Sequence, residues 1–228
     1  MMNLTYTSME DGSVAIQGFN NGEVNGSAYS HIIEFIQLRS VDSLVITSTL
    51  ILDDELLFRR VTSSDISGKS ESVFEFGSIF SEVNRLAIRT TPISEVENIQ
   101  LLVEGDIDGN PLKEVSITLP STKEEAIRSV QEKIDVTLFS MADGSNLPVI
   151  KAEEKILDIQ KKTSSDFQSS LTELIASRKR DVDGCSLGCT AAAEACALAC
   201  GLSGPGIVAC AAVCLTGLSA CLAYCALR

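Results

Sequence analysis

Positive charge is scarce in this sequence, and so is histidine. Its 18 lysine and arginine residues stand against 31 aspartate and glutamate residues, which gives a formal net charge of −13. Such a chain has no basic patch with which to neutralise phosphates, so the composition argues against nucleic-acid binding. The first residues, MMNLTYTSMEDGS, lack a positively charged start and an apolar run. We therefore expect no standard secretory signal peptide and infer that any export uses another route.

The motifs of common enzyme classes are absent as well. The sequence has no Gly-rich phosphate loop, no nucleophile elbow and no metalloprotease helix. Its one histidine, His31, lies beside Ile32 and Ile33 with no cysteine near it, so we interpret it as a surface or partly buried residue. We therefore predict that the chain is not an enzyme and needs no cofactor.

The segment DIDGNP, which holds Asp106, Asp108 and Asn110, has the residue types of a calcium-binding loop. Its glycine falls between the candidate ligands, whereas a calcium loop of this type places glycine after them. We predict a hairpin turn here and no metal site.

Residues 1–120 show the alternation of apolar and polar side chains that is typical of strands. Turn-forming residues at Asp53, Asp54 and Gly105–Pro111 separate neighbouring strands. We predict a β-rich domain over residues 1–120, with one short helix at Tyr29–Leu38. The predicted strands are Ser13–Gly18, Ser43–Leu52, Glu55–Thr62, Glu71–Phe76, Asn84–Thr90, Asn98–Glu104 and Glu114–Leu119.

The periodicity then changes to that of helices. A capping-box-like start predicts one helix from Ser121 to about Asp135, and apolar residues at helical spacing predict another within Val149–Arg178. The polar stretch Lys161–Ser165 is expected to interrupt the second helix. We interpret residues 121–180 as a helical linker. It ends in a basic processing stretch, Arg178, Lys179 and Arg180.

All eight cysteines lie in residues 181–228, where charge almost disappears. The pattern Cys-x3-Cys-x6-Cys-x3-Cys occurs there twice, which indicates an internal duplication. On a helix these spacings return to within roughly 60° of one direction, so each half is predicted to be a helix with one cysteine face. Gly204, Pro205 and Gly206 favour a bend between the halves. The predicted fold class is α+β: a β-rich N-terminal domain, a helical linker and a C-terminal antiparallel helical hairpin.

The spacing also predicts how the cysteines pair. When the cysteines are paired from the outside inward, the two residue numbers of each pair have the same sum. In an antiparallel hairpin centred on Pro205, the two cysteines of every pair therefore lie opposite each other. Disulfides require a close approach of the two helices, which the many Ala, Gly and Ser residues around the cysteines permit. The predicted disulfides are Cys185–Cys225, Cys189–Cys221, Cys196–Cys214 and Cys200–Cys210.

A module of fewer than about 50 residues needs such cross-links, because it cannot build a sufficient core from side chains alone. Its leucines, such as Leu187 and Leu222, are predicted to project away from the cysteine faces. An apolar exterior on a cross-linked peptide indicates a membrane or a hydrophobic partner as its target.

Two alternatives remain open from the residues alone. Ile207–Leu227 is nearly uncharged and about 20 residues long, enough for a C-terminal membrane anchor on a soluble β domain. The Cys-x3-Cys pairs are also typical of a Cu(I)-thiolate binding or storage module, similar to bacterial copper-storage bundles, in which the thiols stay reduced. Zinc is less favoured, because the segment has no histidine and lacks the shorter cysteine spacing.

The layout of the chain resembles a known family. An acidic N-terminal region, the basic stretch Ser177–Arg180 and the Asp-rich start Asp181-Val-Asp-Gly-Cys of an apolar tail rich in Cys, Gly and Ala are similar to precursors of the halocin C-eight type of bacteriocin. The resemblance covers residues 181–228 and the overall order of segments. The cysteines are more regularly spaced here, the peptide is shorter, and no twin-arginine signal is present. The cysteine ladder also resembles that of plant α-hairpinins in architecture.

The resemblance implies that residues 181–228 are a membrane-active antimicrobial product and that the N-terminal part is a propeptide with a possible immunity role. The precursor would be made in the cytoplasm, and the secreted peptide would be oxidised outside it, where disulfides persist. The implied partners are a processing protease, an export machinery and the membrane of a target cell.

Overall fold

The computed structural model describes residues 2–38, 41, 43–78, 83–93, 100–118, 140–149 and 154–177. In the cysteine segment it describes residues 185, 186, 188, 189, 193, 210, 211, 214–218, 221, 222 and 225.

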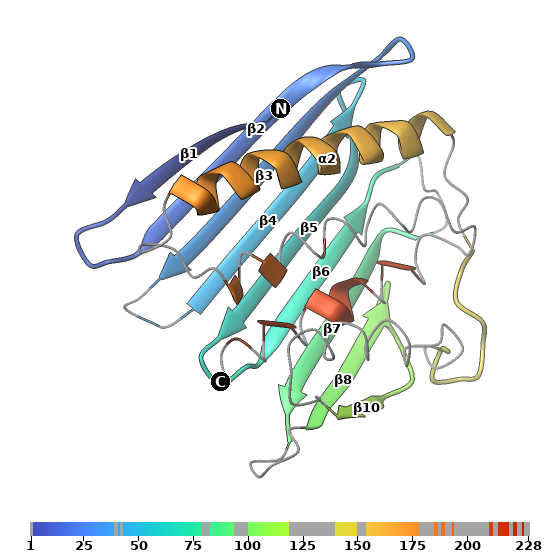
Figure 1. Ribbon diagram of the computed structural model, residues 1–228. Coiled ribbons are helices and arrows are strands. Elements are labelled where there is room, and N and C mark those ends of the chain that lie inside the picture. Colours follow the sequence, from blue (N-terminus) through green and yellow to red (C-terminus); the bar gives the residue numbers. More distant parts are fainter. Residues whose placement is uncertain are drawn as a thin grey trace.

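One antiparallel sheet of ten strands makes up the N-terminal part of the protein (Figure 1). Nine strands follow one another in chain order as a meander, and the short β9 pairs with β8 beside β10. The strands are β1 (Asn3–Ser8), β2 (Val14–Val24), β3 (Ser27–Leu38), β4 (Ser43–Leu52), β5 (Glu55–Asp65), β6 (Ser70–Phe76), β7 (Arg85–Pro92), β8 (Gln100–Ile107), β9 (Asn110–Pro111) and β10 (Val115–Thr118).

The β-rich character predicted for residues 1–120 is confirmed, and each of the seven predicted strands overlaps an observed one. The helix predicted at Tyr29–Leu38 is wrong, because these residues belong to β3. Tyr29, His31, Ile33 and Phe35 alternate along β3 and are all buried on one side of the sheet. This alternation of period two is the pattern of a strand, and pairing with β2 and β4 on both sides stabilises it.

Two-residue turns connect several of the strands. Asp108 and Gly109 both have positive φ between the paired residues Ile107 and Asn110, which confirms the predicted hairpin turn. The predicted turn at Asp53 and Asp54 has the same geometry. Positive φ at both central residues is typical of the type I′ turn, whose twist matches that of the flanking strands.

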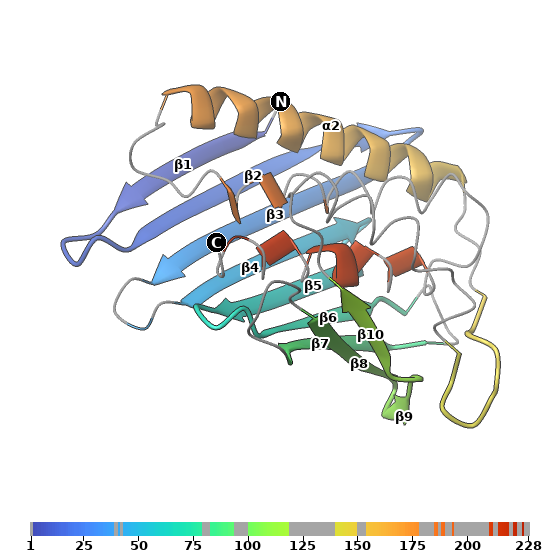
Figure 2. The same ribbon diagram turned by 60° about the horizontal axis from the view of Figure 1, so that its bottom comes forward.

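One helix, α2 (Glu154–Ser177), lies along one face of the sheet over its first strands (Figures 1 and 2). It falls within the range predicted for the second linker helix. The interruption predicted at Lys161–Ser165 is wrong, since the helix runs through these residues. The buried Thr163 Oγ1 donates a hydrogen bond to the carbonyl of Gln160, so this polar residue is accommodated without a break.

The described parts of the cysteine segment lie on the same face of the sheet as α2 and pack against both earlier and later strands (Figures 1 and 2). Together, α2 and these residues complete two hydrophobic clusters with the sheet. One cluster joins strands β3 to β10 to the first half of α2 and to Ala211 and Leu215. The other joins strands β2 to β4 to Phe167 and Leu171 of α2 and to residues on both sides of the cysteine segment.

Several predicted features lie outside the described residues: the helix from Ser121 to Asp135, the processing stretch Arg178–Arg180, and the bend at Pro205. Among the helical residues that the structure does describe, no helix is long and apolar enough to cross a membrane.

Candidate functional site

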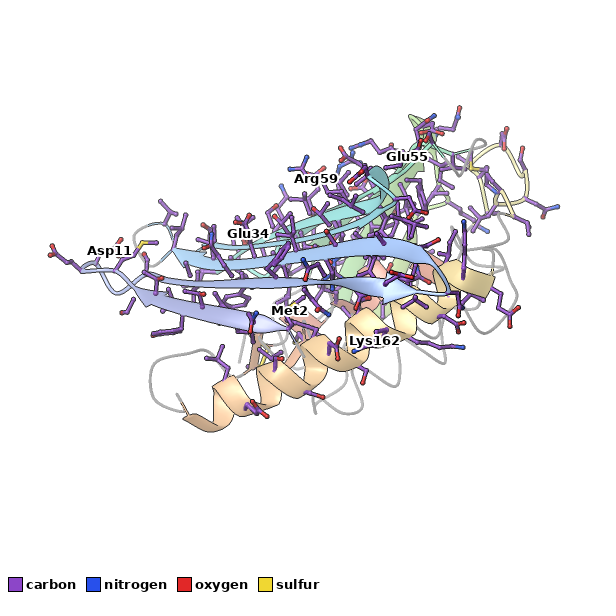
Figure 3. The ribbon with its side chains drawn as sticks, turned by 90° about the horizontal axis from the view of Figure 1, so that it is seen from above. Met2, Asp11, Glu34, Glu55, Arg59 and Lys162 are labelled. Atoms are coloured by element: carbon purple, nitrogen blue, oxygen red, sulfur yellow. A yellow bond between two sulfur atoms is a disulfide. The ribbon has the colours of Figure 1, made fainter. Side chains whose placement is uncertain are left out.

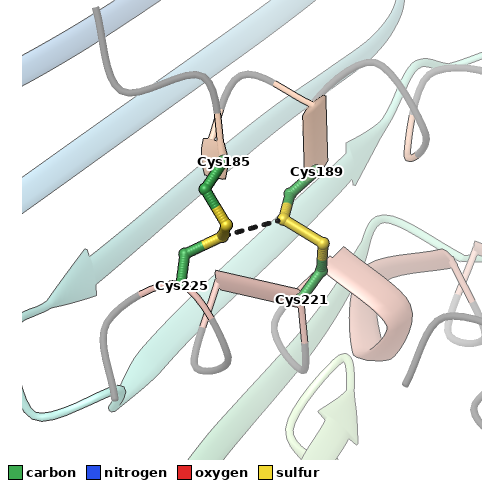
Figure 4. The surroundings of a disulfide bond; sticks show 4 residues. All are labelled: Cys185, Cys189, Cys221 and Cys225. Atoms are coloured by element: carbon green, nitrogen blue, oxygen red, sulfur yellow. Dashed lines mark hydrogen bonds between the residues drawn. A yellow bond between two sulfur atoms is a disulfide. The ribbon is translucent and has the colours of Figure 1, made fainter. Parts of the chain in front are cut away.

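Two disulfides join the two ends of the cysteine segment (Figure 4). Cys185 is bonded to Cys225 with their Cα atoms 5.8 Å apart, and Cys189 is bonded to Cys221 with their Cα atoms 5.6 Å apart. Both separations fall in the range of about 4.4–6.8 Å that a disulfide allows. These bonds are the outer two of the four nested pairs that the cysteine spacing predicts.

Cys210 and Cys214 are disulfide-bonded as well. The residues with which we expect them to pair, Cys200 and Cys196, lie outside the described part of the chain. The two inner pairs therefore stay predictions.

The two outer disulfides touch each other. The Sγ atoms of Cys189 and Cys225, which belong to different bonds, are 3.5 Å apart (Figure 4). Since both sulfurs are already in disulfides, neither has a proton to donate, and the approach is a van der Waals contact. The Sγ atoms of Cys189, Cys221 and Cys225 all lie within 4.8 Å of one another. This closeness follows from the two disulfides, which occupy all three of these sulfur atoms.

Of these two disulfides, Cys189–Cys221 is buried, whereas Cys185 and Cys225 are partly exposed. Cys189 is 1% exposed and Cys221 is 2% exposed, and both belong to the same hydrophobic cluster as Phe35 of β3 and Phe167 of α2. Cys225 packs against this cluster as a partly buried residue. The Cys189–Cys221 bond therefore lies in an apolar environment from which water is largely excluded.

Leucines of the cysteine segment are buried in the same clusters. Leu215, Leu218 and Leu222 are each 2% exposed. Leu215 packs in the cluster of the later strands, and the other two pack in the cluster of the earlier strands. The sequence alone predicts that leucines of this segment, Leu222 among them, lie on the exterior of an isolated hairpin. In the full chain, that exterior is covered by the sheet and α2.

A row of buried polar side chains crosses the centre of the covered sheet face. His31 Nε2 lies 3.1 Å from Ser48 Oγ, Thr62 Oγ1 lies 2.9 Å from Ser72 Oγ, and Ser70 Oγ lies 2.8 Å from Thr90 Oγ1. These cross-strand hydrogen bonds satisfy hydroxyl groups that would be costly to bury alone.

His31 belongs to this row and is only 1% exposed, so its predicted place on a partly buried or surface helix is wrong. Arg60 lies directly opposite Ser48 in the pairing of β4 with β5 and is 3% exposed. An arginine is rarely buried so completely unless its charge is compensated. The covered face of the sheet therefore carries buried polar side chains among its apolar ones, a feature that sequence analysis missed.

Polar contacts fasten α2 to the first strands. Asp166 accepts hydrogen bonds from Asn20 Nδ2 at 2.8 Å and from Lys162 Nζ at 2.5 Å, and Ser170 Oγ donates to the carbonyl of Met2 at 2.8 Å. Burial alone would raise the pKa of Asp166, but the hydrogen bonds from Lys162 and Asn20 outweigh it and hold the pKa below its usual value. The helix that precedes the cysteine segment is thus anchored at a fixed place on the sheet.

The opposite face of the sheet carries charged side chains in solvent, among them Glu34 and Arg59 (Figure 3). A shallow recess of about 490 Å³ on this part of the chain includes Arg85, Arg89 and Asp106. Asp106 accepts hydrogen bonds from Arg85 at 2.9 Å and from Arg89 at 3.0 Å. The bond to Asp106 also raises the pKa of Arg89. These side chains neutralise one another, so the recess has the character of a cross-strand ion-pair network.

No protein-family model, no curated protein and no solved structure matches this chain.

Proposed function

We propose that this chain is the precursor of a bacteriocin-like antimicrobial peptide, with residues 181–228 as the membrane-active product. The product is an antiparallel helical hairpin held by four nested disulfides. It is released by cleavage after Arg178, Lys179 and Arg180 and secreted, whereas residues 1–180 serve as propeptide and immunity region.

The observation that carries this proposal is that the sheet of the same chain covers apolar side chains of residues 181–228. After Arg180 the only charged residues are Asp181, Asp183, Glu194 and Arg228, so the segment has little with which to stay soluble alone. In the full chain its described leucines are buried against the sheet and α2. A precursor that has to remain harmless to a membrane needs this arrangement.

The energy of this shelter indicates how the product would be released. Full burial of one leucine side chain contributes about 1.5–3 kcal/mol. Leu215, Leu218 and Leu222 together therefore hold the segment on the sheet by several times the thermal energy, even after the chain is cut. A lipid bilayer offers the same side chains another apolar environment. Cleavage followed by transfer to a membrane is consequently more favourable than release into water.

The division of the chain also supports a role for residues 1–180 after cleavage. The covered face of the sheet is shaped to residues of the cysteine segment, and the same face is available to a free peptide in the producing cell. We propose that the retained part binds returning peptide there and thereby protects the producer.

The proposal is tested with a recognition sequence for a specific protease inserted between Arg180 and Asp181 of the oxidised full chain. The matched control carries the same insertion between Gly144 and Ser145, in an exposed turn that lies before α2. We expect cutting after Arg180 to cause strong release of dye from lipid vesicles. Cutting the control should cause little release, because residues 181–228 remain joined to the anchored α2.

Purified oxidised 181–228 peptide provides the second measurement and should release dye without any cleavage. If neither the cut chain nor the oxidised peptide permeabilises vesicles or inhibits any tested bacterium, the antimicrobial function is refuted.

A further inference from the structure

Exposed apolar residues gather at one end of the sheet. In an antiparallel meander, alternate connections fall at the same end, so the loops that follow β1, β3, β5 and β7 lie together. The arrowheads of these four strands form a row along one margin of the sheet (Figures 1 and 2). Each of the four loops carries a large apolar residue that is exposed to solvent. These residues are Met9 (42% exposed), Val41 (64%), Ile66 (62%) and Ile93 (49%).

The described tight turns at the opposite end of the sheet are polar. Their central residues are asparagine, aspartate or glycine: Asn25–Gly26, Asp53–Asp54 and Asp108–Gly109. Figure 3 shows the two ends, with Asp11 in the first apolar-tipped loop and Glu55 beside a polar turn. A single exposed apolar residue on a protein surface is ordinary, but one in each of four adjacent loops at one end makes the two ends chemically different.

Hydrogen bonds fix the turns that present two of these residues. The side chain of Asp65 accepts hydrogen bonds from the backbone N–H and the hydroxyl of Ser67, at 2.9 and 2.6 Å, on either side of Ile66. In the first loop, the Met9 N–H donates to the carbonyl of Ser13 at 2.8 Å. Because both turns are short and hydrogen-bonded, the exposure of Met9 and Ile66 belongs to the folded conformation.

The spacing of the loops decides which partner they fit. Neighbouring strands lie about 4.8 Å apart, so successive loops of this row are separated by about 10 Å. Each of the four apolar side chains is at least 42% exposed, so they do not cover one another or form a contiguous patch for a protein partner. A lipid bilayer requires no contiguous patch, since each side chain can enter the boundary between headgroups and acyl chains separately.

The charges beside these residues decide which lipids they fit. Among the described residues in and beside the four loops, the acidic Glu10, Asp11 and Asp65 outnumber the basic Lys69, in a chain of net charge −13. Anionic lipids attract basic segments and repel such carboxylates, whereas zwitterionic headgroups carry no net charge.

We propose that the loop end of the sheet binds the surface of a zwitterionic lipid bilayer, with Met9, Val41, Ile66 and Ile93 inserted below the headgroups. This contact holds the uncut chain at a membrane without permeabilising it. It does not depend on the antimicrobial function, because it uses residues of the sheet and not those of the cysteine segment.

The experiment measures sedimentation of the oxidised full chain with phosphatidylcholine vesicles. We expect Ile66→Ser to lower the partition coefficient by about 3- to 10-fold, because about half of its side chain is available for transfer into lipid. Serine at all four positions should abolish measurable binding. The matched control is Val149→Ser, which changes an apolar residue before α2 that is also 62% exposed and should leave binding unchanged. Far-UV circular dichroism checks the fold of each variant.

Vesicles that contain about one third phosphatidylserine should bind the chain more weakly. The proposal is overturned by equal binding of Ile66→Ser and Val149→Ser, by tighter binding to the anionic vesicles, or by no binding of the unchanged chain at millimolar phosphatidylcholine. Dye enclosed in the same vesicles should be retained while the uncut chain is bound. Binding and dye release are thus separate readouts, so failure of this proposal and failure of the antimicrobial function are distinguishable.

Discussion

The burial of Leu218 makes the strongest prediction about how the cysteine segment and the sheet depend on each other. Leu218 is 2% exposed and belongs to one hydrophobic cluster with Phe35 of β3 and Phe167 of α2. Replacing such a leucine by alanine removes the transfer energy of its side chain and leaves a cavity, at a cost of about 3–5 kcal/mol. We expect Leu218→Ala to lower the free energy of unfolding of the whole protein by about that amount.

The assay measures unfolding of the sheet, although the substitution lies in the cysteine segment. The protein has no tryptophan, so far-UV circular dichroism in the β-sheet band monitors urea unfolding. With a slope of about 2 kcal/mol per molar urea, the midpoint should fall by about 1.5–2.5 M. The control is Ile66→Ala. Ile66 is an apolar loop residue that is 62% exposed, so this change should shift the free energy of unfolding by less than about 0.5 kcal/mol.

The reasoning is refuted if Leu218→Ala leaves the transition of the sheet unchanged and weakens only a separate transition of the cysteine segment. That result would mean that residues 181–228 fold independently in the full chain and that the sheet does not shelter them.

Two further predictions concern the disulfides and α2. Cys185→Ser combined with Cys225→Ser should lower the free energy of unfolding by only about 2.5 kcal/mol in thermal melts. The remaining Cys189–Cys221 bond shortens the loop that the outer bond closes, so the outer bond contributes less. A loss of about 4 kcal/mol or more would mean that the two bonds act independently. The lowered pKa of Asp166 contributes stability that is complete above the unfolded pKa near 4 and is lost as the pH falls through the folded pKa. Asp166→Asn should therefore flatten the acid side of the stability profile, measured by urea unfolding between about pH 2 and 6, and an unchanged acid limb would contradict this.

Local patterns in the sequence predicted much of the sheet. Alternating apolar residues located seven of the strands, and Asp53–Asp54 and Asp108–Gly109 marked turns that the structure confirms. The same kind of signal was present but missed at Asn25–Gly26, where both residues have positive φ between β2 and β3. An Asn-Gly pair between alternating residues is the strongest short-range hairpin signal, and it would have identified β3 in place of the helix at Tyr29–Leu38.

By itself, the sequence determined which segments alternate, where the tight turns fall and how the two outer pairs of cysteines match, because each of these depends on spacing along the chain. Only the tertiary structure decided which face of the sheet is covered and what covers it. The burial of Leu218 depends on residues such as Phe35, more than a hundred positions away, which no local periodicity encodes.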